Sequence, residues 1–90
     1  MFKTLEELIR TIRQRKTSKI EESYTKKLLS DKKLSIAKVK EEIAELIEST
    51  EKNSNQVHEA ADVLYHLMVF LEANDIKIED VMQELRIRKK

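Results

Sequence analysis

At residues 59–71 the chain reads EAADVLYHLMVFL, and this segment decides how the rest of the chain must fold. Nearly every position in it is apolar, and a helix that is apolar on most sides is buried. Glu59 and Asp62 are three positions apart, so a helix carries them on the same side. A carboxylate in such surroundings costs free energy unless a cation compensates its charge. The segment therefore predicts a buried helix with a cation site along one side.

A second pair of carboxylates, Glu42 and Glu45, has the same spacing on the preceding segment. Between the two pairs lies the clearest turn in the chain, NSN at 53–55, so we expect an antiparallel helical hairpin. The pairs are about equally far from this turn and should meet at nearly the same height. Four carboxylates together would stay partly protonated without a cation. Oxygen ligands of this kind suit Mg²⁺ or Mn²⁺, and Mg²⁺ is usually shared with substrate phosphates.

The chain has no glycine and no proline, which restricts its turns. β-Hairpins are disfavoured because their tight turns use Gly or Asn-Gly, and turns with positive φ must fall to Asn or Asp. We predict an all-α fold, an antiparallel bundle of four to five helices in a single domain, 1–90. The expected helices span 4–16, 24–29, 33–52, 55–73 and 78–88, with a looser loop before 24.

Side-chain patterns give the expected ends and faces of these helices. Thr4 and Glu7 form a capping box at the start of the first helix. Apolar residues at helical spacing predict the inward faces of the third and last helices. These residues are Ile36, Val39, Ile43, Leu46 and Ile47 in the third helix, and Val81, Met82 and Leu85 in the last.

Composition excludes several classes of protein. Charged residues make up 39% of the 90 residues, yet the net charge is only +1, so we expect no nucleic-acid partner. The longest apolar run is too short to span a bilayer, and we expect no signal peptide and no membrane partner. There is no cysteine for a disulfide, which fits a cytoplasmic location. Basic residues gather at 10–40, where they could hold phosphates or simply form solvated helix faces.

Three stretches resemble the phosphoribosyl-ATP pyrophosphohydrolase family, a branch of the all-α, MazG-like nucleotide pyrophosphohydrolases. They are Ser-Tyr-Thr at 23–25, KVKEEIAEL at 38–46 and EAADVLYHL at 59–67. The signature of the superfamily is Glu-Glu-x-x-Glu followed by Glu-x-x-Asp. The Ser-Tyr-Thr and Asp-Val-Leu-Tyr-His stretches are narrower and point to the histidine-pathway branch. The likeness covers nearly the whole chain.

The resemblance implies Mg²⁺-dependent hydrolysis of phosphoribosyl-ATP to phosphoribosyl-AMP and pyrophosphate, the second step of histidine biosynthesis, by a cytoplasmic homodimer. Three sets of site residues follow from it. The implied metal ligands are Glu42, Glu45, Glu59 and Asp62. The implied catalytic residues are Glu41 and Glu42, and the implied contacts to the nucleotide substrate are Ser23, Tyr24, Thr25 and Lys38.

The chain departs from the pattern of the family at a few positions. Lys40 and Glu22 stand where a small residue, often Gly, is common, which bears on substrate fit. Lys77 stands where a capping Ser or Thr is usual. His66 and Tyr65 are explained equally well as a hydrogen-bonded core histidine and a packing tyrosine. The cyclohydrolase domain that is often fused to this family is not expected here.

Two alternatives stay open. A house-cleaning pyrophosphohydrolase acting on dUTP, dCTP or damaged nucleotides would keep the same fold, although the Ser-Tyr-Thr and Tyr-His stretches argue against it. A helical interaction module without activity would use the acidic stripe to dock a partner. It would bind no Mg²⁺ and release no pyrophosphate.

Overall fold

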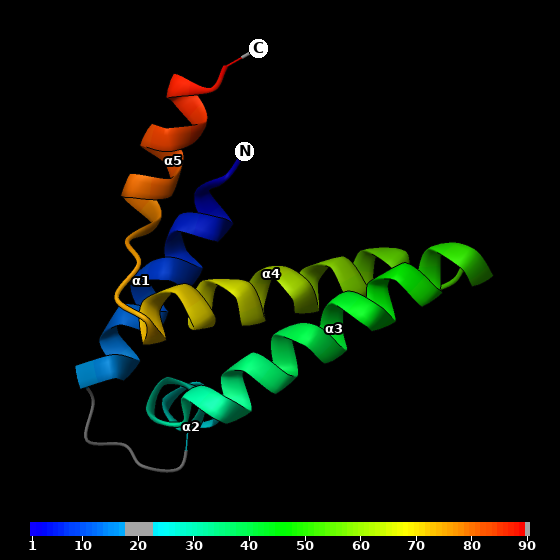
Figure 1. Ribbon diagram of the computed structural model, residues 1–90, viewed down its shortest axis with the longest axis horizontal. Coiled ribbons are helices and arrows are strands. Elements are labelled where there is room, and N and C mark those ends of the chain that lie inside the picture. Colours follow the sequence, from blue (N-terminus) through cyan, green and yellow to red (C-terminus); the bar gives the residue numbers. More distant parts are fainter. Residues whose placement is uncertain (18–22, 90) are drawn as a thin grey trace.

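The computed structural model describes residues 1–17 and 23–89, and these residues form five helices and no strand (Figure 1). The helices are α1 (Lys3–Thr17), α2 (Tyr24–Ser30), α3 (Lys32–Lys52), α4 (Gln56–Ala73) and α5 (Ile78–Ile87). The predicted all-α fold is therefore confirmed, with helix ends within one or two residues of those expected. The loop expected at 18–22 lies outside the described residues. Within the described part, none of the helices combines the length and the apolar character needed to cross a membrane.

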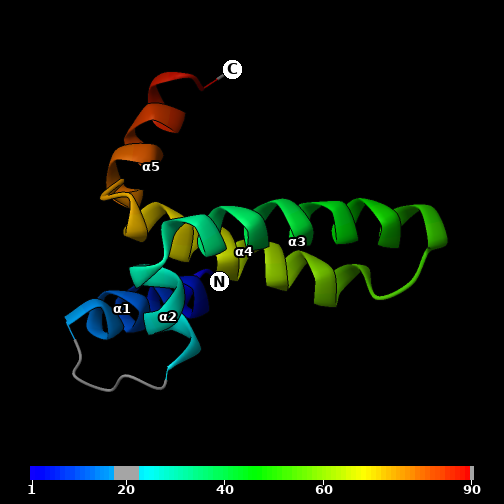
Figure 2. The same cartoon turned by 60° about the horizontal axis from the view of Figure 1, so that its bottom comes forward.

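The antiparallel hairpin of α3 and α4 is the longest feature of the molecule, and its turn lies far from the other helices (Figures 1 and 2). Asn53 and Asn55 have φ angles of 52° and 56°, and Asp75, after α4, has a φ of 57°. These are left-handed conformations that Asn and Asp tolerate better than most residues, as the absence of glycine predicted. Asn55 occupies the expected N-cap position of α4, but its side chain makes no capping hydrogen bond.

The hydrophobic core lies at the opposite end of the hairpin from the turn. Here α1 and α2 pack against the second half of α4. Its buried residues are Ile12, Leu28, Met68 and Val69. Both Leu28 and Val69 are fully buried, so short α2 is anchored in the core although it has only seven residues.

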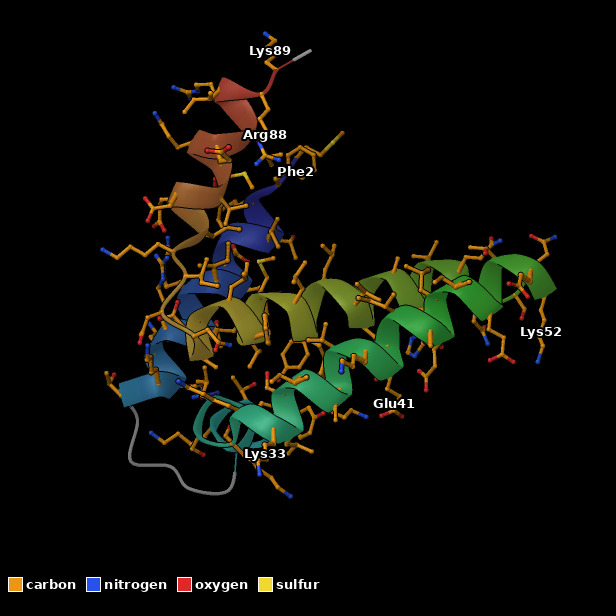
Figure 3. The ribbon with its side chains drawn as sticks, in the orientation of Figure 1. Phe2, Lys33, Glu41, Lys52, Arg88 and Lys89 are labelled. Carbon is orange, nitrogen blue, oxygen red and sulfur yellow. The ribbon has the colours of Figure 1, made fainter. Side chains whose placement is uncertain are left out.

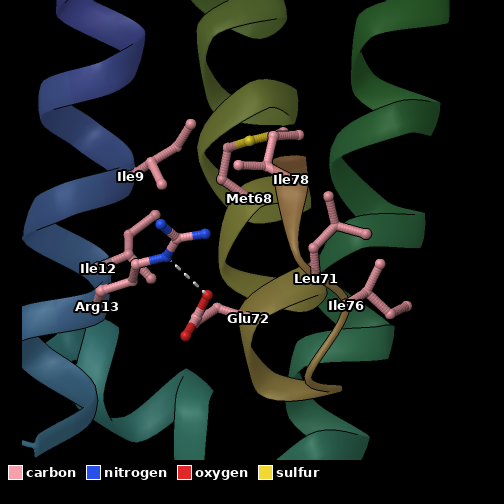
Figure 4. Close-up of a pocket in the computed structure, with 8 residues that line it drawn as sticks. All are labelled: Ile9, Ile12, Arg13, Met68, Leu71, Glu72, Ile76 and Ile78. Atoms are coloured by element: carbon pink, nitrogen blue, oxygen red, sulfur yellow. Dashed lines mark hydrogen bonds and ion pairs between the residues drawn. The ribbon is translucent and has the colours of Figure 1, made fainter. Parts of the chain in front are cut away.

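Ion pairs tie α1 to the end of α4 and the start of α5. Arg13 reaches Glu72, with its Nε 3.4 Å from Oε2, beside a small apolar pocket between α1 and α4 (Figure 4). The same guanidinium contacts both carboxylate oxygens of Glu79 at 2.8 and 2.6 Å. Lys16 Nζ lies 2.6 Å from Asp75 Oδ1. These contacts hold the connection between α4 and α5 against α1.

The face that α3 turns towards α4 is not the one expected. Three of the isoleucines predicted to point inward are 41%, 42% and 54% exposed, and a polar stripe with seven-residue spacing is buried instead. The exposed residues are Ile36, Ile43 and Ile47, and the buried stripe is Ser35, Glu42 and Ser49. This rotation of α3 buries Glu42, where the charge of Asp62 on α4 acts on it. The expected inward face was therefore wrong for these three isoleucines, whereas Val39 and Leu46 from the same prediction are half-buried.

Two further expectations were wrong. Met82 and Leu85 are 50% and 57% exposed, because α5 projects away from the rest of the molecule (Figures 1 and 2). The first helix begins at Lys3, and the Glu6 amide donates to the Phe2 carbonyl at 3.1 Å. Thr4 is thus already inside the first turn and cannot be the N-cap of a capping box.

Candidate active site

Four carboxylates come together where α3 and α4 face each other. Glu42 is buried, and the other three are half-buried. On α3, one oxygen each of Glu41, Glu42 and Glu45 lies within 4.8 Å of the others. On α4, His58, Glu59 and Asp62 offer ligand atoms that are equally close to one another. The structure therefore gathers the acidic residues that the spacing singled out into one group on each arm of the hairpin, and the charge of Glu45 on α3 acts on Glu59 on α4.

The pKa shifts follow from this crowding. Burial raises the pKa of Glu42 above its ordinary 4.5, and the hydrogen bond and charge of Glu45 raise it further. Burial also raises the pKa of Glu59, followed by the charge of Glu45. Asp62 adds to the negative charge around both groups. Each helix thus contributes a carboxyl group whose ionisation is opposed by burial and by neighbouring carboxylates.

Two carboxylate oxygens of this cluster are buried without a partner. They are Oε2 of Glu42 and Oε2 of Glu59, one from each helix. A buried acceptor that makes no hydrogen bond is costly, and a charged one more so. Oxygen donors of this type are the preferred ligands of Mg²⁺ and Mn²⁺, so the residues present fit a divalent cation between α3 and α4.

Basic and acidic residues flank the cluster along α3. Lys38 Nζ lies 3.1 Å from Oε2 of Glu41 and 3.6 Å from Oε1 of Glu42. The hydrogen bond to Glu41 raises the pKa of Lys38. The side chain of Glu41 is 51% exposed and projects from the edge of α3 away from α4 (Figure 3). Glu41 thus faces solvent while its neighbour Glu42 is buried.

Aromatic residues border the cluster where α2 packs on α4. The Tyr24 hydroxyl lies 2.9 Å from Nε2 of His66, and Nδ1 of His66 lies 2.8 Å from the Asp62 carbonyl oxygen. The hydroxyls of Thr25 and Tyr65 also form a hydrogen bond. His66 is 7% exposed, so it is a buried, hydrogen-bonded histidine that lies beside the candidate site.

Two further residues lie near the site: Ser23, which was predicted as a substrate contact, and His58, which was not predicted. Ser23 caps α2, its hydroxyl accepting a hydrogen bond from the Lys26 amide at 3.4 Å. His58 was not singled out from the sequence, although its Nε2 lies 3.4 Å from Oδ2 of Asp62. The spacing of His58 and Asp62 could have indicated this contact, because residues four apart on a helix are neighbours.

Comparison with known proteins gives a consistent match. Residues 5–89 match the family described as phosphoribosyl-ATP pyrophosphohydrolase. The chain is 44% identical over 87 residues to phosphoribosyl-ATP pyrophosphatase of Dechloromonas aromatica, covering 93% of this chain and 81% of that protein. It is 43% identical over 86 residues to histidine biosynthesis bifunctional protein HisIE of Pyrococcus furiosus, covering 96% of this chain. The chain spans only 41% of the length of that bifunctional relative.

Proposed function

The chain belongs to the phosphoribosyl-ATP pyrophosphohydrolase family, and on this premise we propose that it hydrolyses phosphoribosyl-ATP to phosphoribosyl-AMP and pyrophosphate, the second step of histidine biosynthesis. The observation that carries the proposal is the pair of buried, unpartnered carboxylate oxygens, one on each arm of the hairpin. We further propose that the reaction takes place in the cytoplasm, where this pathway would find its nucleotide substrate.

In this proposal, four carboxylates hold Mg²⁺, for which Mn²⁺ could substitute. They are Glu42, Glu45, Glu59 and Asp62. When bound, the metal would neutralise phosphate charge and lower the pKa of a coordinated water. The raised pKa values of Glu42 and Glu59 support the assignment, because a cation would compensate the burial and the neighbouring negative charges that cause them.

The remaining polar residues would bind the substrate and handle the proton of the attacking water. Glu41 is the better candidate for the base, since it stays accessible with one oxygen within 4.8 Å of oxygens of Glu42 and Glu45, whereas Glu42 has a buried oxygen suited to ligation. Lys38 lies between them and could move from Glu41 to a phosphate oxygen. Residues 23–25 lie at the start of α2, on the His66 side of the carboxylates, where they could contact the nucleotide.

We also propose a homodimer. Two apolar surfaces remain uncovered in the single chain, one on α3 and one on the projecting α5. The residues are Ile36, Ile43 and Ile47 on α3, and Met82, Leu85 and Ile87 on α5. Exposed apolar side chains that gather on one surface often mark an interface. A second copy would supply complementary surfaces of the same kind.

The test is pyrophosphate release from phosphoribosyl-ATP, with and without Mg²⁺, beside dUTP and dCTP. The proposal requires Mg²⁺-dependent turnover with clear preference for phosphoribosyl-ATP. Replacing Glu45 by Gln should lower kcat/KM at least about 100-fold, because a metal of this kind contributes several kcal/mol. The matched control is Glu48→Gln, an exposed carboxylate on the same helix. Preference for dUTP or dCTP would favour a house-cleaning enzyme, and unchanged turnover in Glu45→Gln would refute the metal site.

A further inference from the structure

We propose that His66 is a positioning residue: it fixes the Tyr24 hydroxyl, and with it the first turn of α2, beside the carboxylate cluster. The inference rests on the proposed function, in which Tyr24 contacts the substrate. It concerns a buried imidazole that lies outside the proposed metal ligands and has no assigned role. The two ring nitrogens of His66 have different partners, and that difference carries the argument.

The partners of His66 determine which nitrogen holds the hydrogen. Nδ1 lies 2.8 Å from the carbonyl oxygen of Asp62, which can only accept, so Nδ1 must donate. In the neutral imidazole Nε2 is then an acceptor. The Tyr24 hydroxyl, 2.9 Å from Nε2, is therefore the donor of that hydrogen bond. It follows that Tyr24 has no hydroxyl hydrogen left for a phosphate oxygen and offers the substrate its ring and a lone pair.

A second bond between the same two helices lies directly beside the first. Thr25 follows Tyr24 on α2, Tyr65 precedes His66 on α4, and the hydroxyls of Thr25 and Tyr65 are hydrogen-bonded. The Tyr24 and Tyr65 rings are stacked with centroids 6.3 Å apart, and the Tyr65 and His66 rings meet edge to face at 5.0 Å. Two adjacent bonds restrict both the position and the rotation of α2.

The position of α2 matters because a helix of seven residues has little stability of its own. Leu28 anchors its far end in the core, whereas its first turn depends on the contacts of Tyr24 and Thr25. Since the charge of Lys38 also acts on Tyr24, the ring lies near the proposed phosphate contact. His66 itself is 7% exposed and acts on the substrate only through Tyr24.

The experiment compares Tyr24→Phe, His66→Asn and the double variant in phosphoribosyl-ATP hydrolysis. The Asn side chain places its amide near the position of Nδ1, so it can still donate to the Asp62 carbonyl, but it is too short to reach the Tyr24 hydroxyl. Each single variant should raise KM about tenfold, the worth of one hydrogen bond, with kcat changed less than about threefold. The double variant should be no worse than the singles, because both remove the same bond. His66→Gln, which places an amide oxygen near Nε2, should restore much of the affinity.

Two measurements do not depend on activity. A ¹⁵N spectrum of the His66 ring in the wild-type protein should show hydrogen on Nδ1 only. Amide hydrogen exchange should accelerate in α2 in the single variants and stay unchanged in α3 and α4. The control is Lys52→Gln, which removes an exposed ion pair at the far end of α3 and should alter none of these values.

Several results would overturn the proposal. Additive effects of the two substitutions, a loss of kcat at unchanged KM, or hydrogen on Nε2 instead of Nδ1 would each do so. If the wild-type protein does not hydrolyse phosphoribosyl-ATP, the proposed function fails. The spectrum and the exchange rates would still decide whether His66 positions α2.

Discussion

Glu42 is a carboxyl group at a place where the fold alone favours its neutral form. It is 6% exposed, and burial together with Glu45 raises its pKa. In the metal-free protein the folded state therefore keeps a proton at pH values above 4.5 that the unfolded chain has already released. Folding stability should then fall as the pH rises through the folded pKa. A cation would remove this cost, so stability and function oppose each other at one residue.

The variant Glu42→Gln tests whether the buried carboxylate lowers the stability of the metal-free protein. Without metal it should unfold at a higher temperature than the wild type at pH 7, because the buried charge is gone while the shape is kept. Adding Mg²⁺ should raise the melting temperature of the wild type but hardly that of the variant. Thermal unfolding with and without Mg²⁺ measures both effects. A variant that is less stable than the metal-free wild type would contradict this account.

The pKa of Glu79 is shifted in the opposite direction to that of Glu42. Its bidentate contact with Arg13 lowers its pKa from 4.5 to about 2. Stability from this pair is present above pH 4.5 and is lost as the pH falls towards 2. Glu79→Gln should therefore lower the melting temperature at pH 7, and the difference from the wild type should close between pH 4.5 and 2. The effect should be small, because the side chain of Glu79 is 62% exposed. A difference that persists at pH 2 would show another cause.

At the scale of the helix, α3 has a buried polar face and an exposed apolar face. The stripe of Ser35, Glu42 and Ser49 is buried, and the isoleucines at 36, 43 and 47 are exposed. Ser49 satisfies its hydroxyl internally, through a hydrogen bond to the Leu46 carbonyl at 2.6 Å. Ser49 is thus buried with its hydroxyl satisfied within its own helix.

Enlarging the buried stripe should separate the helices. Ser35 is 2% exposed, and replacing it by Leu would overpack the contact, at a cost of about 1–3 kcal/mol in the free energy of unfolding. Ser35→Ala is the matched control and should cost less than about 1 kcal/mol, since it changes little volume. Urea unfolding measures both. Equal stabilities would show that the surroundings of Ser35 are not closely packed.

The helices themselves could be predicted because their ends depend on local chemistry. With no glycine available, Asn53 and Asp75 were the residues able to adopt the left-handed turns after α3 and α4. The spacing of the carboxylates likewise predicted their convergence. The inward face of α3 could not be predicted, because apolar periodicity shows that a face is covered but not by which chain. The contacts of Tyr24 and Thr25 with α4 depend on tertiary packing, which spacing along the chain does not encode.

At the scale of the whole molecule, the core is too small for the chain. A protein of 90 residues buries only about 60–65% of its unfolded surface. Within residues 1–17 and 23–89, the buried apolar residues are Ile12, Leu28, Met68, Val69 and Ala73. More large apolar side chains than this are exposed, several of them on α3 and α5. Covering those faces with a second copy would complete the core.

The variant Ile43→Glu tests whether a second copy covers the exposed isoleucines of α3. Ile43 is 42% exposed at the middle of the outer face of α3, and a charge there would be buried unpaired in the dimer. Light scattering at micromolar concentration should find a dimer for the wild type and a monomer for the variant, with a lower melting temperature. The control is Glu48→Lys, a charge change about 140° around the same helix. A monomeric wild type would leave the isoleucines of α3 without a structural reason, whereas a dimer that survives Ile43→Glu would have its interface elsewhere, with α5 as the next candidate.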